Sequence, residues 1–179
     1  MLKALAIIAV ILLVAIAAVL AYAATKPDTF TVQRSLDIKA PPDKIFALIN
    51  DFRSWTAWSP YEKRDPDLKR TYSGAPTGKG AAYAWEGNKN VGAGRMEITD
   101  TAPASKIVIA LHFFRPFKAQ NTAEFTLVPQ GDTTNVTWAM HGPNLYIGKV
   151  MSTFMNMDKM IGKDFADGLV NLKAAAEKS

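Results

Sequence analysis

Residues 142–172 read GPNLYIGKVMSTFMNMDKMIGKDFADGLVNL, and this stretch decides the fold. Its large apolar residues recur at intervals of three or four, the spacing of one face of an α-helix. They are Ile147, Val150, Phe154, Met157, Ile161, Phe165, Leu169 and Leu172. Asn144 follows Gly142 and Pro143, and its side chain suits the N-cap position. The pattern predicts one continuous C-terminal helix of about 30 residues with a single apolar face.

Segments of alternating apolar and polar residues precede this helix, and alternation is typical of half-buried strands. They are residues 30–38, 68–72, 81–86, 94–101, 106–114, 117–128 and 134–140. The turns between them are mostly short, which favours an antiparallel meander over parallel β-α-β units. After the first strand, Pro41 and Pro42 favour a helix start, and helical spacing continues to Phe52. A short helix and a turn through Trp55 and Trp58 are therefore expected before the second strand.

These elements make an α+β domain. Its economical packing is a curved antiparallel sheet wrapped around the long C-terminal helix. We expect a transmembrane segment over residues 1–24, a linker over 25–29 and one domain over 30–179. That domain is long enough to bury a substantial core.

The transmembrane prediction rests on residues 4–24, which carry no charge and consist of Leu, Ile, Val and Ala apart from Tyr22. As a helix they would span ~31 Å, which matches a hydrocarbon core of about 30 Å. A cleaved signal peptide is the alternative, with Ala21-Tyr22-Ala23 as its cleavage site, but the apolar run is longer than such peptides have. An uncleaved signal anchor is the favoured interpretation. The flanking charges alone would weakly keep the C-terminal side inside. Long domains cross a membrane largely regardless of charge, so we expect the domain on the extracytoplasmic, periplasmic side.

Composition excludes several classes of function. The chain has no cysteine, so it can form no disulfide, thiolate metal site or cysteine nucleophile. Its net charge of +5 comes from basic residues interleaved with acids, as in residues 62–65 (EKRD), which reads as a solvated surface. A nucleic-acid groove requires clustered cations. We therefore expect no nucleic-acid partner, no metal and no cofactor.

Five segments carry a family resemblance: residues 38–46 (IKAPPDKIF), 58–63 (WSPYEK), 72–74 (YSG), 85–89 (WEGNK) and 157–165 (MDKMIGKDF). With this order of elements, residues 30–176 resemble the START-like (SRPBCC) superfamily, which has the helix-grip fold. The last four segments are similar to its membrane-anchored bacterial branch of polyketide cyclases/dehydrases and lipid-transport proteins. The resemblance implies a cavity between sheet and helix that holds an apolar small molecule. It does not imply catalysis, because the superfamily mixes carriers, sensors and enzymes.

Large apolar side chains on the predicted inner faces are the candidate ligand-binding residues. They are Tyr83, Trp85, Met96, Phe113, Phe125, Trp138, Met140, Phe154, Met157 and Ile161. Methionine suits an adaptable apolar surface, and Tyr and Trp add polar groups. An ordinary packed core is the alternative for each residue. Gly162 and Gly168 within the helix indicate either close backbone approach or space for a ligand.

Catalytic residues are not predicted with any specificity. Residues 74–80 (GAPTGKG) lack the spacing and the hydroxyl residue of a phosphate-binding loop. His112 and His141 alternate with apolar residues and are expected to face outward. Glu86, beside a turn in a family-like segment, is the remaining acid/base candidate, with Tyr83 or Tyr61 as proton donor.

Three functions follow. The favoured one is a membrane-tethered binder or carrier of a lipid-like molecule, since a tether holds the pocket near membrane-derived ligands. The second is an enzyme of cyclase or dehydrase type that uses Glu86. The third is a protein-interaction module in which an exposed Trp55/Trp58 region docks a partner at the membrane.

Overall fold

The computed structural model of the protein describes residues 2–178, with the side chain of Met157 outside that description. Seven antiparallel strands form one sheet, in the order β1-β7-β6-β5-β4-β3-β2. The strands are β1 (Thr29–Ile38), β2 (Lys69–Gly74), β3 (Ala81–Glu86), β4 (Ala93–Ala102), β5 (Lys106–Arg115), β6 (Ala119–Gln130) and β7 (Thr133–Pro143). Each predicted strand exists, with shifts of one or two residues at most ends. The order is a meander from β2 to β7, to which β1 adds beside the last strand.

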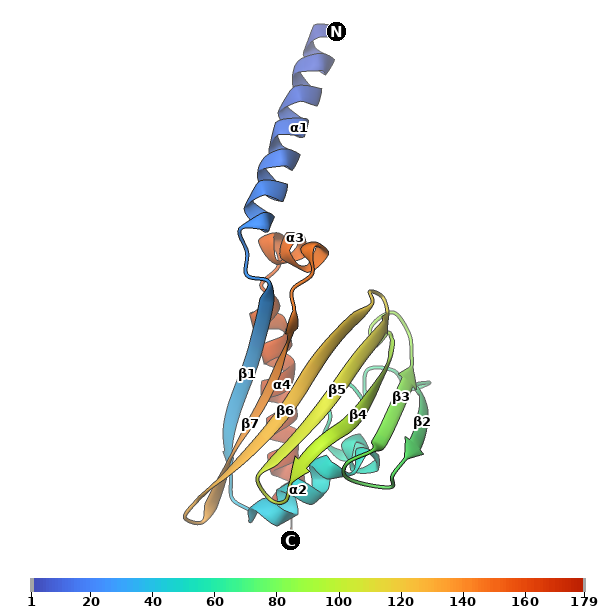
Figure 1. Ribbon diagram of the computed structural model, residues 1–179, viewed down its shortest axis with the longest axis vertical. Coiled ribbons are helices and arrows are strands. Elements are labelled where there is room, and N and C mark those ends of the chain that lie inside the picture. The colour runs from blue at the N-terminus through green and yellow to red at the C-terminus, as the bar shows by residue number, and fades with distance from the viewer. Residues whose placement is uncertain (1, 179) are drawn as a thin grey trace.

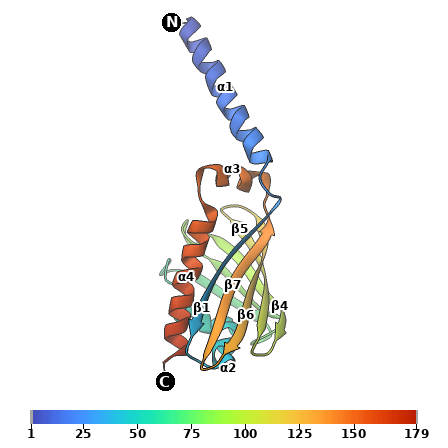
Figure 2. The same cartoon turned by 90° about the vertical axis from the view of Figure 1, so that its left-hand side faces the viewer.

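Helices occupy both ends of the chain and the connection after β1. They are α1 (Leu2–Ala24), α2 (Pro42–Asn50), the 3-10 helix η1 (Phe52–Ala57), α3 (Tyr146–Phe154) and α4 (Met157–Ala176). The curved sheet wraps around α4, while α2 covers the end of the grip farthest from α1 (Figures 1 and 2). The α+β helix-grip prediction is confirmed. Pro42 lies in the first turn of α2, where its missing N–H costs no helical hydrogen bond.

The prediction of one continuous C-terminal helix is wrong. Met155 is extended (φ −129°, ψ 133°), so α3 ends before it. Asn156 then caps α4, because its side-chain oxygen accepts a hydrogen bond from the Lys159 N–H at 2.8 Å. The break leaves the apolar spacing nearly in phase, and periodicity alone could not reveal it. Asn144 is also not an N-cap: its amide donates to the carbonyl of Pro27 at 3.0 Å.

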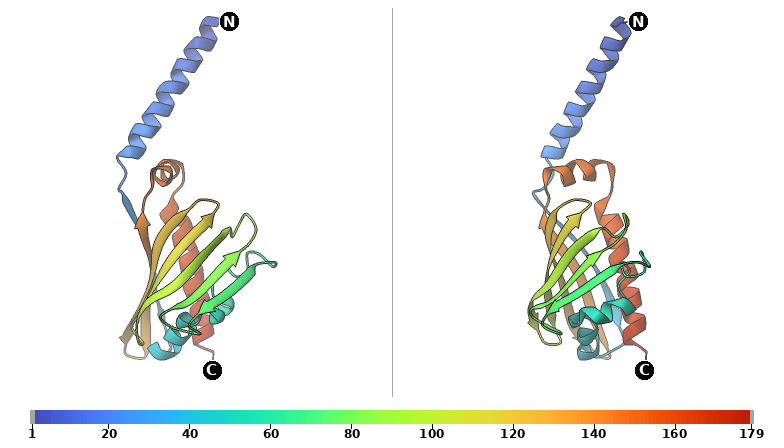
Figure 3. Two further views of the ribbon diagram at one scale, coloured as in Figure 1. Left: turned by 45° about the vertical axis from the view of Figure 1, so that its right-hand side comes forward. Right: turned by 90° about the vertical axis from the view of Figure 1, so that its right-hand side faces the viewer.

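Helix α1 projects from the domain, and α3 lies crosswise beneath its end (Figures 1 and 3). The Tyr146 hydroxyl donates to the carbonyl of Leu20 at 2.8 Å. The buried Lys149 donates to the Asp28 carboxylate at 2.5 Å in the linker. Helix α1 is long and apolar enough to span a membrane, and its side chains are almost all exposed. The fold therefore places α3 between a potential membrane span and the sheet.

Candidate functional site

The half of the grip farthest from α1 is filled by aromatic side chains, which we call the packed half. Five rings from η1, the loop after it, β6, β7 and α4 contact one another: Trp55, Trp58, Phe125, Trp138 and Phe165. Trp138 stacks on Phe165 with ring centroids 4.2 Å apart, and Phe125 stacks on Trp138 at 5.0 Å. The Trp55 and Trp58 indoles donate to the carbonyls of Ile49 and Leu48. This half is a close-packed core.

Gly168 allows α4 to approach this cluster. A Cβ at Gly168 would lie 2.7 Å from a ring carbon of Trp138 and 3.0 Å from Cδ of Pro60. At Gly162 a Cβ would lie 1.9 Å from the guanidinium of Arg34, which pairs with Asp158 at 3.1 Å. Both glycines therefore serve close approach rather than leaving space for a ligand.

Burial of the inner face falls along the strands toward α1. On β5, Ile107 and Ile109 are fully buried, whereas Leu111 and Phe113 are only half-buried. On β6, Phe125 is fully buried and the inward-facing Asn121 is half-buried. Trp85 on β3 and Ile161 on α4 are half-buried as well. We call the region lined by Trp85, Leu111, Phe113, Asn121 and Ile161 the open half.

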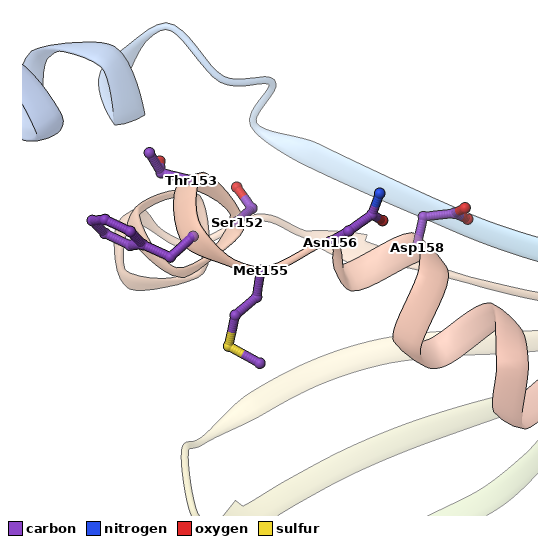
Figure 4. Close-up of a pocket in the computed structure, with 6 residues that line it drawn as sticks. Ser152, Thr153, Met155, Asn156 and Asp158 are labelled. Atoms are coloured by element: carbon purple, nitrogen blue, oxygen red, sulfur yellow. The ribbon is translucent and has the colours of Figure 1, made fainter.

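A groove of about 450 Å³ lies beside the open half, at the junction of α3 and α4. It is lined by Ser152, Thr153, Phe154, Met155, Asn156 and Asp158. Met155 points from the junction toward the sheet, while Thr153 points toward α1 (Figure 4). Met155 is therefore the labelled side chain of this groove that points toward the sheet (Figure 4).

The ten predicted ligand-binding residues divide between these regions. Trp85, Phe113 and Ile161 line the open half, and Met140 lies buried next to it. Phe125 and Trp138 belong to the packed half, and Tyr83 and Met96 are buried in the core between the two. Phe154 lies on α3 rather than on the long helix and is 71% exposed. Met157 lies outside the described side chains.

A buried polar group adjoins Trp85, and the sequence interpretation missed it. Glu62 accepts hydrogen bonds from the Tyr83 hydroxyl at 2.7 Å and from Arg70 Nε at 2.6 Å. Burial, followed by the hydrogen bond to Glu62, raises the pKa of Tyr83, so the phenol stays protonated at neutral pH. Glu62 and Asp65 are both buried, so the reading of residues 62–65 as a solvated run is wrong. The family-like segment 58–63 was the signal that could have identified Glu62.

One buried donor in the packed half has no partner. The indole Nε1 of Trp138 is inaccessible and has no acceptor within the described residues. An unsatisfied buried donor costs about 1–3 kcal/mol. A water or an oxygen of a bound molecule would remove this cost.

The sequence profile of the family described as "Polyketide cyclase / dehydrase and lipid transport" matches residues 29–177. The chain belongs to this family. Comparison with curated proteins gives no match at the level of sequence. Family membership and the START-like fold together point to the binding of a hydrophobic ligand.

Solved structures of bacterial proteins share the fold of this polyketide cyclase/dehydrase and lipid-transport family member. A protein from Thermobifida fusca is 21% identical with a TM-score of 0.61, covering 82% of this chain and 92% of its own. A START superfamily protein from Mycobacterium smegmatis is 16% identical with a TM-score of 0.57, covering 82% and 97%. Protein CV1439 from Chromobacterium violaceum is 13% identical with a TM-score of 0.59, covering 86% and 100%. At these identities the likeness establishes the fold alone.

Glu86, the acid/base candidate predicted from the sequence, lies outside the space between sheet and helix. Glu86 is exposed and pairs with Arg115 at 3.1 Å. It lines a second pocket, of about 460 Å³, at the edge of the sheet, together with Lys69, Thr71, Phe114 and Arg115 and also with Trp85. His112 and His141 also alternate onto the outer face, as the sequence predicts. All three side chains alternate onto the face of the sheet that points away from α4.

The expectation of an exposed Trp55/Trp58 region is also wrong. Trp55 and Trp58 are buried in the packed half, with Trp58 fully inaccessible. The sequence predicted a turn through these two residues after a short helix. In the structure they instead pack inward against Phe125 of β6 and Trp138 of β7. The docking surface assumed for an interaction module is therefore missing.

Proposed function

We propose that the protein is a membrane-tethered binder or carrier of a lipid-like molecule, which it holds in the open half of the grip. The observation that carries the proposal is the gradient of burial along β5 and β6. Apolar inner side chains there are sealed at one end and half-exposed at the other. Half-exposed Trp85, Leu111 and Phe113 would gain roughly 25 cal/mol for each Å² that an apolar ligand covers.

The position of the open half supports the same function. The open half lies at the end of the domain that carries α1, so a ligand leaving a membrane would meet it first (Figure 1). A tether raises the local concentration of such ligands without any new contact. The side chain of Asn121 is a half-buried polar group in the open half that would orient a ligand's oxygen.

Photo-crosslinking of the full chain in lipid nanodiscs tests the ligand site. A fatty acid and an isoprenoid, each with a diazirine on its apolar part, are the probes. We expect crosslinks to residues 111–113 of β5 and to the first turns of α4. Leu111→Trp, which fills the open half, should reduce them at least several-fold, whereas Val170→Trp on the exposed side of α4 should not. Crosslinks confined to α1 and the outer face would contradict the proposal.

The tether is tested by the intact mass of the protein in the membrane fraction. An uncleaved anchor predicts a chain that retains residues 2–24 and resists extraction at alkaline pH. A chain that begins after Ala23 or Ala24 would be a free carrier, and the tether would be excluded.

A further inference from the structure

The tip of the β5–β6 hairpin, residues 114–118, has the sequence FRPFK. Phe114 and Phe117 are 53% and 56% exposed. Two adjacent, largely exposed phenylalanines leave a considerable apolar area in water, and such patches typically mark interaction sites. Lys118 beside them is exposed, and Arg115 pairs with the exposed Glu86.

This tip lies at the same end of the domain as α1. The β5–β6 hairpin rises toward α3, whereas the β6–β7 turn and the C-terminal end of α4 lie at the opposite end (Figures 1 and 3). The opposite β6–β7 turn is polar, with Gln130, Gly131 and Asp132. Exposed aromatic residues are therefore concentrated on the side from which the apolar helix projects.

Helix α3 contacts the domain-side end of α1, so the end of the domain that carries the hairpin tip lies close to the apolar helix. The 23 residues of α1 span about 34 Å, slightly more than a hydrocarbon core of about 30 Å. Leu20 lies near the domain-side end of α1, so its carbonyl would lie close to the headgroup layer. The Tyr146 hydroxyl bonds that carbonyl, and the Tyr146 side chain is 49% exposed. Tyrosine is enriched at this depth in membrane proteins.

We propose that the hairpin tip 114–118, together with Tyr146, forms a second membrane contact in the headgroup layer of the bilayer that holds α1. The partner is the lipid surface, because the patch lies at the end of the domain from which the membrane-spanning helix projects. The patch also combines aromatic with basic side chains. This contact rests on the tether in the proposed function. It fixes the orientation of the domain at two separated points, so that the open half faces the bilayer rather than swinging on the linker.

The absence of cysteine from the chain permits a direct test by site-directed spin labelling. Single substitutions Leu13→Cys, Lys118→Cys and Asp132→Cys are made in the full chain. Each variant is labelled with a nitroxide and reconstituted in vesicles of phosphatidylcholine and phosphatidylglycerol. Collision rates with oxygen, which concentrates in lipid, and with a water-soluble nickel complex then give the depth of each label.

We expect the label at position 13 to lie in hydrocarbon. The label at position 118 should collide with the nickel complex several-fold less often than the label at position 132. Adding Phe114→Ser and Phe117→Ser should restore the rate at position 118 to that at position 132. The matched control Val170→Ser removes an equally exposed apolar side chain from α4 and should change nothing.

A label at position 118 that behaves like the one at 132, with position 13 in hydrocarbon, overturns the second contact and leaves the tether intact. A label at position 13 in water overturns the tether and the contact together. Protection at position 118 that persists in detergent without vesicles, or after both Phe→Ser changes, shows that protein rather than lipid covers the tip, and it overturns the proposal.

Discussion

The two halves of the grip are built from the same strands and the same helix, yet one is closed and the other is not. In the packed half, β6 and β7 place Phe125 and Trp138 against Phe165, and the rings fill the space between sheet and helix. In the open half, β5 presents Leu111 and Phe113 and β6 presents Asn121, and no ring from α4 faces them in the described residues. The difference arises from what covers the sheet: at one end η1 supplies Trp55 and the loop after it supplies Trp58.

Under the proposed function, fold stability and ligand binding depend on different ends of one apolar surface. A core that fills the whole concave face would leave no place for a ligand. A face left open throughout would lack the close packing that holds the curved sheet against α4. Substitutions that are identical in chemistry but placed in opposite halves should therefore have different consequences.

The largest effect is expected from a matched pair of Phe→Ala changes on the inner face. Phe125→Ala in the packed half should lower the free energy of unfolding by about 3–5 kcal/mol, because it leaves a cavity in a close-packed cluster. Phe113→Ala in the open half should cost only about 1 kcal/mol, because this side chain is already half-exposed. Thermal and chemical unfolding of the full chain measures both, and equal losses would refute the division into halves.

Glu62→Gln tests the buried polar group that lies beside Trp85. The change removes the ion pair with Arg70 but keeps an acceptor for the Tyr83 hydroxyl, so we expect a loss of about 1–3 kcal/mol of unfolding free energy. Tyr83→Phe is the control: it removes one hydrogen bond and should cost about 1 kcal/mol. A Glu62→Gln protein with an unchanged free energy of unfolding would show that the ion pair of Glu62 with Arg70 adds no stability. Diazirine crosslinking measured in parallel separates a structural role from a role in ligand binding.

Helix glycines offer a finer comparison, since on α4 Gly168 faces the packed half whereas Gly162 faces the side chain of Arg34 on β1. Gly168→Ala would collide with Trp138 and Pro60, and the expected cost of about 1–3 kcal/mol exceeds the gain in helix propensity of up to about 1 kcal/mol. Gly162→Ala would meet the flexible end of Arg34, which can move, and should be closer to neutral. Unfolding of both variants measures the difference. A larger loss of unfolding free energy in Gly162→Ala than in Gly168→Ala would contradict this expectation.

Sequence patterns predicted most of the fold because alternation and helical spacing are local properties. The strands, the Pro42 helix start and the helix grip all follow from them. What failed depends on tertiary structure. Asn156 could have continued the helix, and only the return of the chain toward Arg34 and the sheet explains why it caps α4 instead. Trp58 and Glu62 lie in an irregular segment without periodicity, so their burial could not be predicted.

The candidate site was only partly predictable for the same reason. Alternation identifies which face of a strand points inward, and Phe113 and Phe125 were correctly placed on the inner face. It cannot tell which inner residues are covered, because coverage depends on η1 and α4, which come from distant parts of the chain. Burial therefore separates the residues of the open half from those of the core, and residue type does not.

The smallest effect is expected at the linker beside the open half. The hydrogen bond from Lys149 holds the pKa of Asp28 below its usual value. The stabilisation is therefore present at neutral pH and is lost as the pH falls below about 4. Asp28→Asn should mimic this loss at neutral pH, so that hydrogen exchange rises in α3, residues 146–154, but not in residues 106–110 of the packed half.

Asp158→Asn is the control for Asp28→Asn, because Asp158 pairs with Arg34 at the start of α4 and does not contact Lys149. Its substitution should leave exchange in α3 unchanged. If Asp28→Asn increased exchange in both halves together, α3 would be part of the cooperative core and the two halves would unfold as one. If only α3 responds, this end of the domain can loosen beneath α1 while the aromatic cluster keeps the domain folded.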